Sequence, residues 1–272
     1  MTAVLSKRMQ AVADMVPAGH IAADIGCDHG FVSIYLVQNG ICPRVYAADV
    51  RPGPLARAKE HICRSGLQER IIPVLSDGLL QVPVGAGEAD VMIAAGMGGK
   101  LTVRILSDAV SKTEQLSACI LEPQSEVWLV RRCLAQLRFT IIQEDMVFED
   151  GKYYPVMLAV NDRKPENTKA VQEACSRNRL QKERMREAGF SEEEYCQACA
   201  CFGASLIREK NAVLLSFLEH TITQNAALLR ELPVPEKEGE DAGKPERIRR
   251  RTEELENRIS LAGKVLDLMR NQ

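Results

Sequence analysis

The stretch Ala22-Ala23-Asp24-Ile25-Gly26-Cys27-Asp28-His29-Gly30 sets the architecture of this chain. A short apolar strand, residues 21–25, runs into a glycine-bearing turn, and a predicted helix follows over residues 31–38. Gly26 can take a backbone conformation that is closed to residues with a Cβ, and Gly30 lets the helix begin close to any molecule in the turn. A strand, a glycine turn and a helix in this order indicate a nucleotide-type site.

Asp24 distinguishes two kinds of nucleotide site. A dinucleotide site carries the pattern G-x-G-x-x-G, which lets the backbone approach a pyrophosphate, and an acid inside that turn would repel the anion. The glycines here are Gly26 and Gly30 only. S-adenosylmethionine has no phosphate but carries a sulfonium and an ammonium, which a carboxylate attracts. We therefore expect a site for S-adenosylmethionine; the alternative is an ordinary strand-to-helix turn.

Composition predicts a cytoplasmic protein of one large domain or two. Its 272 residues, 46% of them hydrophobic, are ample for a buried core. A formal net charge of −2 excludes a uniformly basic protein, so any contact with a polyanion needs local patches. Apolar and charged residues interleave near the start, and no apolar run approaches membrane-spanning length. We expect no cleavable leader, no membrane partner and a monomer.

Cysteine usage indicates reduced thiols. Nine cysteines are scattered without a disulfide framework. Only Cys196-x-x-Cys199-x-Cys201 suggests a metal site, which would need a fourth ligand, and Cys175 and His220 are the only candidates nearby. We expect no metal and interpret the cluster as buried helical cysteines.

Two further acids follow the next two predicted strands. Residues 44–50 read as a second strand that ends at Asp49. In doubly wound sheets an acid at this point accepts hydrogen bonds from the ribose hydroxyls of an adenosine cofactor, whereas the alternative is an N-cap of the next helix, residues 54–65. Residues 71–75 form a third strand, and Asp77-Gly78 after it suits either an adenine amino group or a simple turn.

The fourth strand leads into a loop of small residues, Gly96-Met97-Gly98-Gly99. Rossmann-like enzymes place the lip of the active site at this position. A fifth strand follows at residues 118–121, and residues 139–147 and 153–160 predict an antiparallel hairpin. The expected fold class is α/β, with a seven-stranded Rossmann-like methyltransferase sheet.

Composition changes at Asn161, after which the sequence shows helical periodicity alone. We therefore predict a cofactor-binding catalytic domain over residues 1–160 and a helical domain over residues 161–272. Helices at 203–232 and 246–270, separated by an acidic loop at 233–244, predict a coiled-coil-like antiparallel hairpin. Residues 163–186 carry eight Lys or Arg against three Glu, which indicates either a solvated face or a docking surface for phosphates.

Several motifs together resemble the bacterial tRNA (adenine-22-N1)-methyltransferase family. They are Leu5-Ser6-x-Arg8, Ala23-Asp24-Ile25-Gly26-x-Asp28-His29, Gly53-Pro54, Asp77-Gly78-Leu79, Ala95-Gly96-Met97-Gly98-Gly99 and Tyr153-Tyr154. The resemblance implies a class I fold, S-adenosylmethionine as cofactor, a helical C-terminal domain and methylation of N1 of an adenosine in tRNA. Glu122 and Gln124 depart from the family's L-Q-P-N, and Phe202-Gly203-Ala204 departs from F-G-P. We leave Glu122 and Gln124 out of the catalytic set.

Adenine N1 has a lone pair, so its methylation needs an in-line approach with water excluded rather than a strong base or a metal. Because N1 lies on the Watson-Crick edge, the nucleotide must be unpaired or turned outward. Glycines of the lip would shape the slot for the base, while Asp28 and His29 would orient the base or the methionine end of the cofactor. The alternative for these two residues is that His29 caps the helix and Asp28 accepts backbone donors.

The predicted site falls into three groups. The candidate catalytic residues are Asp28, His29, Gly96, Met97 and Gly98. The candidate cofactor-binding residues are Asp24, Gly26, His29, Gly30, Asp49, Val50, Asp77, Gly78 and Gly96. The candidate RNA-binding residues, which would contact tRNA, are Arg8, Arg177, Arg179, Lys182, Arg184 and Arg186.

Two other functions fit parts of the pattern. A small-molecule methyltransferase would share the first domain but would have no use for a basic helical tail. A non-catalytic RNA-binding protein would use the tail without the cofactor. Asn-Pro-Pro-Tyr does not follow the fourth strand, which argues against methylation of the exocyclic amine of adenine.

Overall fold

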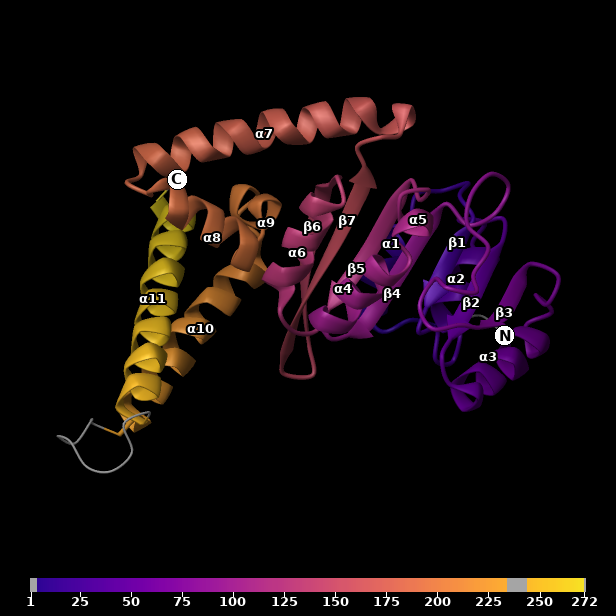
Figure 1. The fold of residues 1–272 in the computed structure, drawn as a ribbon, viewed down its shortest axis with the longest axis horizontal. Helices are drawn as coiled ribbons and strands as arrows, with labels where there is room; N and C mark the ends of the chain where they lie inside the picture. The colour runs from indigo at the N-terminus through magenta and orange to yellow at the C-terminus, as the bar shows by residue number, and fades with distance from the viewer. Residues whose placement is uncertain (1–3, 234–243, 272) are drawn as a thin grey trace. The chain divides into compact units, whose positions relative to one another are not determined.

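The computed structural model describes residues 4–233 and 244–271 (Figure 1). The chain forms two compact units, Met1–Asn178 and Arg179–Gln272. The domain boundary predicted at residue 160 lies at the end of the last strand, but the first unit continues beyond it. Val171 packs against the core of the sheet and Ala174 is buried, which ties the first half of the following helix to this unit.

Seven strands form one sheet in the order β3-β2-β1-β4-β5-β7-β6. Their bounds are β1 (Ala22–Ile25), β2 (Val45–Asp49), β3 (Ile71–Leu75), β4 (Val91–Met97), β5 (Ala118–Pro123), β6 (Phe139–Glu149) and β7 (Lys152–Asn161). β7 is antiparallel to β5 and β6, and the other pairs are parallel. The predicted Rossmann-like sheet and its final hairpin are confirmed. The strand order reverses between β1 and β4, where doubly wound sheets bind their ligands.

The central strands are buried on both faces. Along β1, β2 and β4 successive side chains enter two different hydrophobic clusters, because neighbouring residues of a strand point to opposite faces. The first cluster includes residues of α1 (Lys7–Asp14), α2 (Phe31–Gln38) and α3 (Pro52–Arg64). The second includes residues of α4 (Gly99–Asp108) and α6 (Val127–Gln136), and α5 (Val110–Thr113) follows α4. This three-layer arrangement leaves the carboxyl ends of the strands free for a site.

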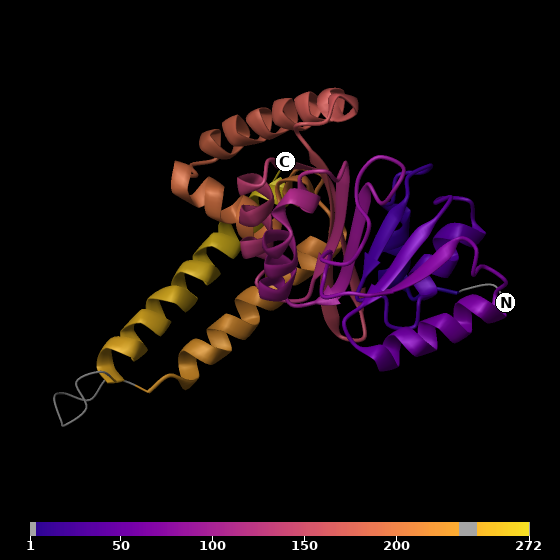
Figure 2. The ribbon, with the colours of Figure 1, turned by 45° about the vertical axis from the view of Figure 1, so that its right-hand side comes forward.

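The second unit is helical. After β7 the chain forms η1 (Pro165–Asn167) and α7 (Thr168–Glu187), which continues from the first unit into the second. α8 (Glu192–Phe202), α9 (Ala204–Arg208), α10 (Ala212–Glu231) and α11 (Lys244–Asn271) follow. α10 and α11 lie side by side in both views (Figures 1 and 2), and an ion pair joins Arg270 near the end of α11 to Glu219 in the first half of α10. The two helices are therefore antiparallel, as predicted.

The single helix predicted over residues 203–232 is wrong, because the chain breaks between α9 and α10. Lys210 adopts the left-handed conformation with φ of 50°. The side chain of Asn211 then accepts hydrogen bonds from the amides of Val213 and Leu214, which starts a new helix. The acidic loop predicted at 233–244 lies, from 234 to 243, outside the described residues.

Two other expectations concern the surface. The cysteine cluster lies on α8, but Cys196 and Cys201 are exposed and Cys199 is half-buried, so the prediction of buried cysteines is wrong. The described part of the chain contains no group of three or more His, Cys, Asp or Glu side chains arranged to hold a metal ion. None of the helices described is both long enough and apolar enough to cross a membrane.

Candidate active site

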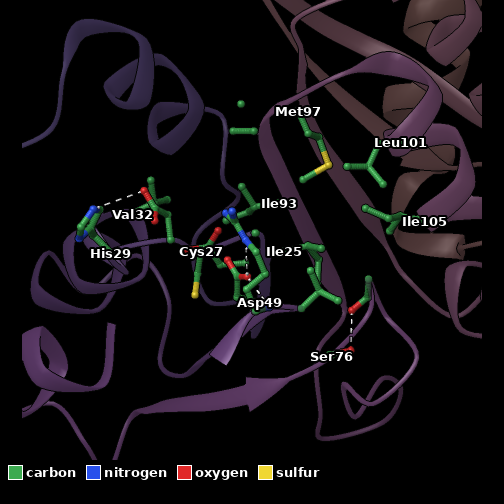
Figure 3. Close-up of a pocket in the computed structure, with 18 of the residues that line it drawn as sticks. Ile25, Cys27, His29, Val32, Asp49, Ser76, Ile93, Met97, Leu101 and Ile105 are labelled. Atoms are coloured by element: carbon green, nitrogen blue, oxygen red, sulfur yellow. Dashed lines mark hydrogen bonds and ion pairs between the residues drawn. The ribbon is translucent and has the colours of Figure 1, made fainter. Parts of the chain in front are cut away.

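A pocket of about 640 Å³ lies at the carboxyl ends of the parallel strands. Asp24 from β1, Asp49 from β2 and Asp77 after β3 all line it, together with Gly96, Met97 and Gly98 of the glycine lip, which spans the end of β4 and the start of α4. The three acids predicted at successive strand ends therefore share one cavity. Figure 3 shows Met97 and Leu101 across the pocket from His29.

Asp24 is a buried acid at the end of β1, with an exposed fraction of 5%. Its Oδ2 accepts a hydrogen bond of 2.6 Å from the hydroxyl of Ser33 on α2. Burial raises the pKa of Asp24 to about 6, hydrogen bonds from Ser33 oppose this shift, and the charge of Asp49 adds to it. A buried carboxylate without a cation is costly, so this end of the pocket suits a positively charged ligand.

Asp49 is equally buried at the end of β2, with an exposed fraction of 5%. Its Oδ1 accepts a hydrogen bond of 2.8 Å from the amide of Arg51. The N-cap of α3 is Arg51, without a side-chain cap, so the alternative of Asp49 as an N-cap is wrong. No hydrogen bond within the described residues joins Oδ2 of Asp49, which leaves this oxygen for a ligand.

Asp77 and Gly78 form the turn after β3. Asp77 is half-exposed and pairs with Nη2 of Arg104 on α4 at 2.9 Å. The hydroxyl of Ser76 donates to the carbonyl of Gly78 at 2.7 Å, which fixes the turn. Ile105 also lines the pocket and is the side chain that a Cβ on Gly78 would meet. A carboxylate beside an apolar wall suits a flat heterocycle with an amino group.

Asp28 and His29 lie at the turn between β1 and α2. Nε2 of His29 is 3.5 Å from Asp28, and Arg57 pairs with the other oxygen of Asp28 at 3.5 Å. His29 stacks on Phe31 with ring centroids 5.7 Å apart. The N-cap of α2 is Gly30, without a side-chain cap, so the alternative in which His29 caps the helix is wrong.

The glycine lip begins with a β-bulge. The register between β4 and β5 shifts between Ala95 and Met97, which leaves Gly96 as the extra residue, with φ of 78°. The amide of Gly96 donates to Oε2 of Glu122 at 2.6 Å. The methyl group of Met97 lies 3.2 Å from the position that a Cβ on Gly26 would occupy. The lip therefore closes over the first glycine turn.

The predicted RNA-binding residues are distributed over both units. Arg8 lines the pocket in the first unit. The other five are exposed on α7, with Arg177 in the first unit and the rest in the second; these five are Arg177, Arg179, Lys182, Arg184 and Arg186. Lys182 pairs with Glu192 and lies 5.7 Å from the centre of the Tyr195 ring.

Comparison with known proteins gives the family. A family described as "Methyltransferase domain" matches residues 5–157. The tRNA (adenine(22)-N(1))-methyltransferase of Bacillus subtilis (strain 168) is 30% identical over 267 residues, which cover 97% of each chain. This chain belongs to the tRNA (adenine-22-N1)-methyltransferase family. The resemblance predicted from the motifs is thereby confirmed.

Solved structures agree with this placement. The crystal structure of the B. subtilis M1A22 tRNA methyltransferase TrmK is 28% identical, has a TM-score of 0.76, and covers 97% of this chain and 100% of its own. A Streptococcus pneumoniae protein solved in complex with S-adenosyl-L-methionine is 24% identical, with a TM-score of 0.73 over 97% of this chain and 100% of its own, and shares the fold.

The pocket of this tRNA methyltransferase contains every predicted catalytic and cofactor-binding residue except Gly30. Gly30 lies behind the turn, where a Cβ would be 3.3 Å from that of Ala58. The pocket is also lined by Arg51, Arg104 and Leu101, which were not predicted because no local pattern tells where a loop or helix side chain points. Ser33 carried a readable signal, since it lies on the predicted helix directly after the turn.

Proposed function

We propose that this chain transfers the methyl group of S-adenosylmethionine to N1 of adenosine 22 in tRNA. The observation that carries the proposal is that Asp24, Asp49, Asp77 and the glycine lip line one pocket, in a member of the tRNA (adenine-22-N1)-methyltransferase family. We also propose a cytoplasmic location, because the tRNA substrate is found there. The monomeric state stays a prediction.

The residues of the pocket fit S-adenosylmethionine. Asp24 offers a buried negative charge to the ammonium and sulfonium. Asp49 offers its Oδ2 to the ribose hydroxyls, because this oxygen has no hydrogen-bond partner in the described part of the chain. Gly26, with φ of 75°, keeps the turn free of a side chain that would meet Met97. Asp77 suits the adenine amino group.

Cofactor binding is expected to weaken as the pH falls below about 6. Burial raises the pKa of Asp24 to about 6, and the ionised carboxylate is the form that attracts a cationic ligand. Below that pH the proton must leave before the ligand binds, so the dissociation constant should rise by up to about tenfold per pH unit. Isothermal titration calorimetry with S-adenosylmethionine over a pH series measures this dependence.

Asp24→Asn is the control for that pH series. Its amide cannot ionise, so we expect weak binding without the pH dependence. The pKa of Asp24 in the folded protein lies above its ordinary value of 3.8, so its contribution to stability is full below pH 3.8 and is lost as the pH rises through about 6. Above pH 7 the cofactor-free variant should therefore be more stable than the wild type by up to about 3 kcal/mol. A wild-type affinity that is constant from pH 8 to pH 5 would refute this role of Asp24.

The chemistry asks little of the protein beyond position and surroundings. When bound, S-adenosylmethionine supplies an electrophilic methyl group on a sulfonium. Gly96 and Gly98 leave room at the lip for the edge of an adenine ring, and Met97 excludes water from this side. The product adenine is cationic, so the carboxylate of Asp28, held by Arg57 and facing the pocket, stabilises it electrostatically.

A basic pocket in the second unit supports the helical domain as the part that docks tRNA. It has a volume of about 400 Å³ and is lined by Arg184, Arg208 and Lys210, with Glu187 as an opposing charge. Gln181, with an exposed fraction of 4%, presents an amide to the same pocket. Cations around a concave surface favour a phosphate of the RNA backbone.

Reversing two of these charges is expected to weaken tRNA binding. For Arg184→Glu with Lys210→Glu we expect affinity to fall at least about tenfold and the salt dependence of log K to lose about two units of slope. Filter binding of tRNA over a salt series measures both. Lys59→Glu with Arg64→Glu, exposed on α3, makes the same change in net charge and should leave the slope unchanged. If both double variants lose the same tRNA affinity, the effect comes from net charge alone and not from this pocket.

Nucleoside mass spectrometry tests the proposed function directly. Incubation of unmodified tRNA with the protein and methyl-labelled S-adenosylmethionine should yield one labelled 1-methyladenosine per tRNA. A transcript with guanosine in place of adenosine 22 should stay unlabelled. Labelled small molecules without labelled tRNA would favour the small-molecule methyltransferase, and tRNA binding without heat on titration of the cofactor would favour the non-catalytic RNA-binding protein.

A further inference from the structure

Glu122 is a fully buried carboxylate at the end of β5, with an exposed fraction of 0%. The preceding strand residues, 118–121, are apolar and buried. Oε2 of Glu122 accepts hydrogen bonds from the amide of Gly96 at 2.6 Å and from Nη1 of Arg8 at 2.9 Å. Its Oε1 is buried without a hydrogen-bond partner among the described residues. Burial raises the pKa of Glu122, whereas Arg8 and the Gly96 amide lower it.

The bond to Gly96 completes the bulge at the lip. Ala95 pairs with Glu122 and Met97 pairs with Pro123, so Gly96 has no residue opposite it in the ladder. The extra residue of a bulge leaves its backbone groups unpaired unless another group takes them. The side chain of Glu122 accepts the hydrogen bond from the Gly96 amide, which fixes the bulge.

The bond to Arg8 fixes a guanidinium beside the lip of the pocket. The Arg8 head lies 4.8 Å over the ring of Tyr154, and its Nε is 3.9 Å from Glu149. Its Nη1 would lie 3.5 Å from a Cβ on Gly96, so the head stands directly beside the lip. The side chain of Arg8 is 21% exposed and lines the pocket, which leaves part of its donor set available.

Arg8 differs from the other arginines of the pocket by the side on which it lies. Arg104 pairs with Asp77, and Arg51 lies beside Asp49, so both belong to the part of the pocket with the adenosine acids. Arg8 belongs to the lip, where the RNA base enters under the proposed function. A guanidinium at this point matches a phosphate of the RNA backbone, because its planar donors bind phosphate oxygens in pairs.

We infer that Glu122 is a positioning residue, which aims Arg8 at the phosphate next to the target adenosine and holds the Gly96 bulge in the matching geometry. The inference rests on the proposed function, since an RNA substrate brings this phosphate to the lip. A preformed guanidinium costs less entropy to engage than a free surface arginine, and the gain is realised only when the target nucleotide is seated.

Glu122→Gln isolates the Arg8 part of this arrangement. The amide oxygen still accepts from Gly96, but the charge that holds Arg8 is lost. We expect kcat/KM for tRNA to fall at least about tenfold, while the dissociation constant for S-adenosylmethionine stays within about twofold of wild type. Because Glu122 acts through Arg8, the double variant Arg8→Gln with Glu122→Gln should lose no more than Arg8→Gln alone.

A modified tRNA identifies the phosphate. Methylphosphonate at one of the two linkages of adenosine 22 removes one negative charge, and it should slow the wild type about as much as Arg8→Gln slows the unmodified tRNA. The same modification should not slow Arg8→Gln further. If Glu122→Gln does not fold, this comparison still tests the contact between Arg8 and the phosphate, and a methylphosphonate that slows Arg8→Gln as much as the wild type would overturn the inference.

A buried Arg–Glu pair away from the pocket provides the matched control. Arg131 and Glu144 are 2.9 Å apart, have exposed fractions of 8% and 6%, and do not line the pocket. Glu144→Gln should lower stability and leave kcat/KM unchanged. Two results would overturn the inference: losses of kcat/KM that multiply in the double variant Arg8→Gln with Glu122→Gln, or equal losses of cofactor and tRNA affinity in Glu122→Gln. The proposed function would still hold if the wild type is active. A wild type that leaves tRNA unmethylated would overturn both.

Discussion

Asp49→Ala is expected to weaken binding of S-adenosylmethionine at least about 100-fold and to leave the fold intact. Two hydrogen bonds from the ribose hydroxyls to an ionised carboxylate are worth about 1.5 to 3 kcal/mol each, so losing both costs two or more powers of ten in affinity. The exposed fraction of Asp49 is 5%, so water cannot take over the hydrogen bonds of the lost carboxylate without a large cost in free energy. Its charge also raises the pKa of Asp24, so its removal relieves a repulsion in the cofactor-free protein.

Calorimetric titration of three variants checks this expectation. Asp49→Asn keeps an acceptor for the amide of Arg51 and should lose about tenfold in affinity. Asp77→Ala removes a half-exposed carboxylate that already pairs with Arg104, so its loss should be smaller than that of Asp49→Ala. The order would show which acid binds the ribose. If Asp49→Ala binds S-adenosylmethionine as tightly as the wild type and has an unchanged melting temperature, Asp49 does not bind the ribose.

The three acids could be predicted because the topology of a parallel sheet brings distant strand ends together. Asp24, Asp49 and Asp77 each follow an apolar run, and a βαβ repeat separates the first two, so their meeting at one edge follows from the pattern. The glycine lip could be predicted for the same reason, since Gly96 lies near the carboxyl end of β4, the strand next to β1.

The role of Glu122 could not be predicted from the family motifs alone. Because Glu122 departs from the family pattern, it was left out of the predicted catalytic residues. An acid after the apolar residues 118–121 nevertheless indicates a buried, paired carboxylate. The partner could not be read from the sequence, because Arg8 lies on α1 and reaches β5 only in the folded chain. The position of Glu122 therefore indicates a paired carboxylate, whereas its partner depends on the tertiary fold.

The helical unit was predicted in kind but not in detail. Helical periodicity predicts α10 and α11, whereas the break before α10 depends on one residue, Lys210, in a conformation that lysine rarely adopts. Asn211 carried the available signal, because asparagine is a preferred N-cap. The basic residues of α7 form a charge pattern that the sequence shows. Of these residues only Arg184 lines the pocket with Arg208, and that pocket depends on how α9 packs.

Two neighbouring glycines of the lip are expected to differ sharply in their tolerance of a methyl group. A Cβ on Gly99 would lie 2.4 Å from the carbonyl oxygen of Ser125 and 2.8 Å from that of Glu126, and both are backbone atoms. A Cβ on Gly98 would meet only the hydroxyl of Ser125 at 3.1 Å, and this side chain can rotate away. The amide of Gly99 also donates to the Ser125 carbonyl at 3.0 Å, so the two segments cannot separate without losing that bond.

We therefore expect Gly99→Ala to lower the free energy of unfolding by about 2 to 3 kcal/mol, and Gly98→Ala by less than about 1 kcal/mol. The loop that an alanine at 99 would push away, residues 124–126, carries Gln124. This residue lines the pocket, and its backbone amide donates to the carbonyl of Met97, so Gly99→Ala should also lower kcat for tRNA methylation. Urea unfolding followed by fluorescence measures the difference in the catalytic unit, because the sole tryptophan, Trp128, lies directly after this loop. Equal stabilities of the two variants would show that the backbone of Ser125 and Glu126 yields at little cost, and the lip would then be a flexible loop rather than a fixed wall for the target base.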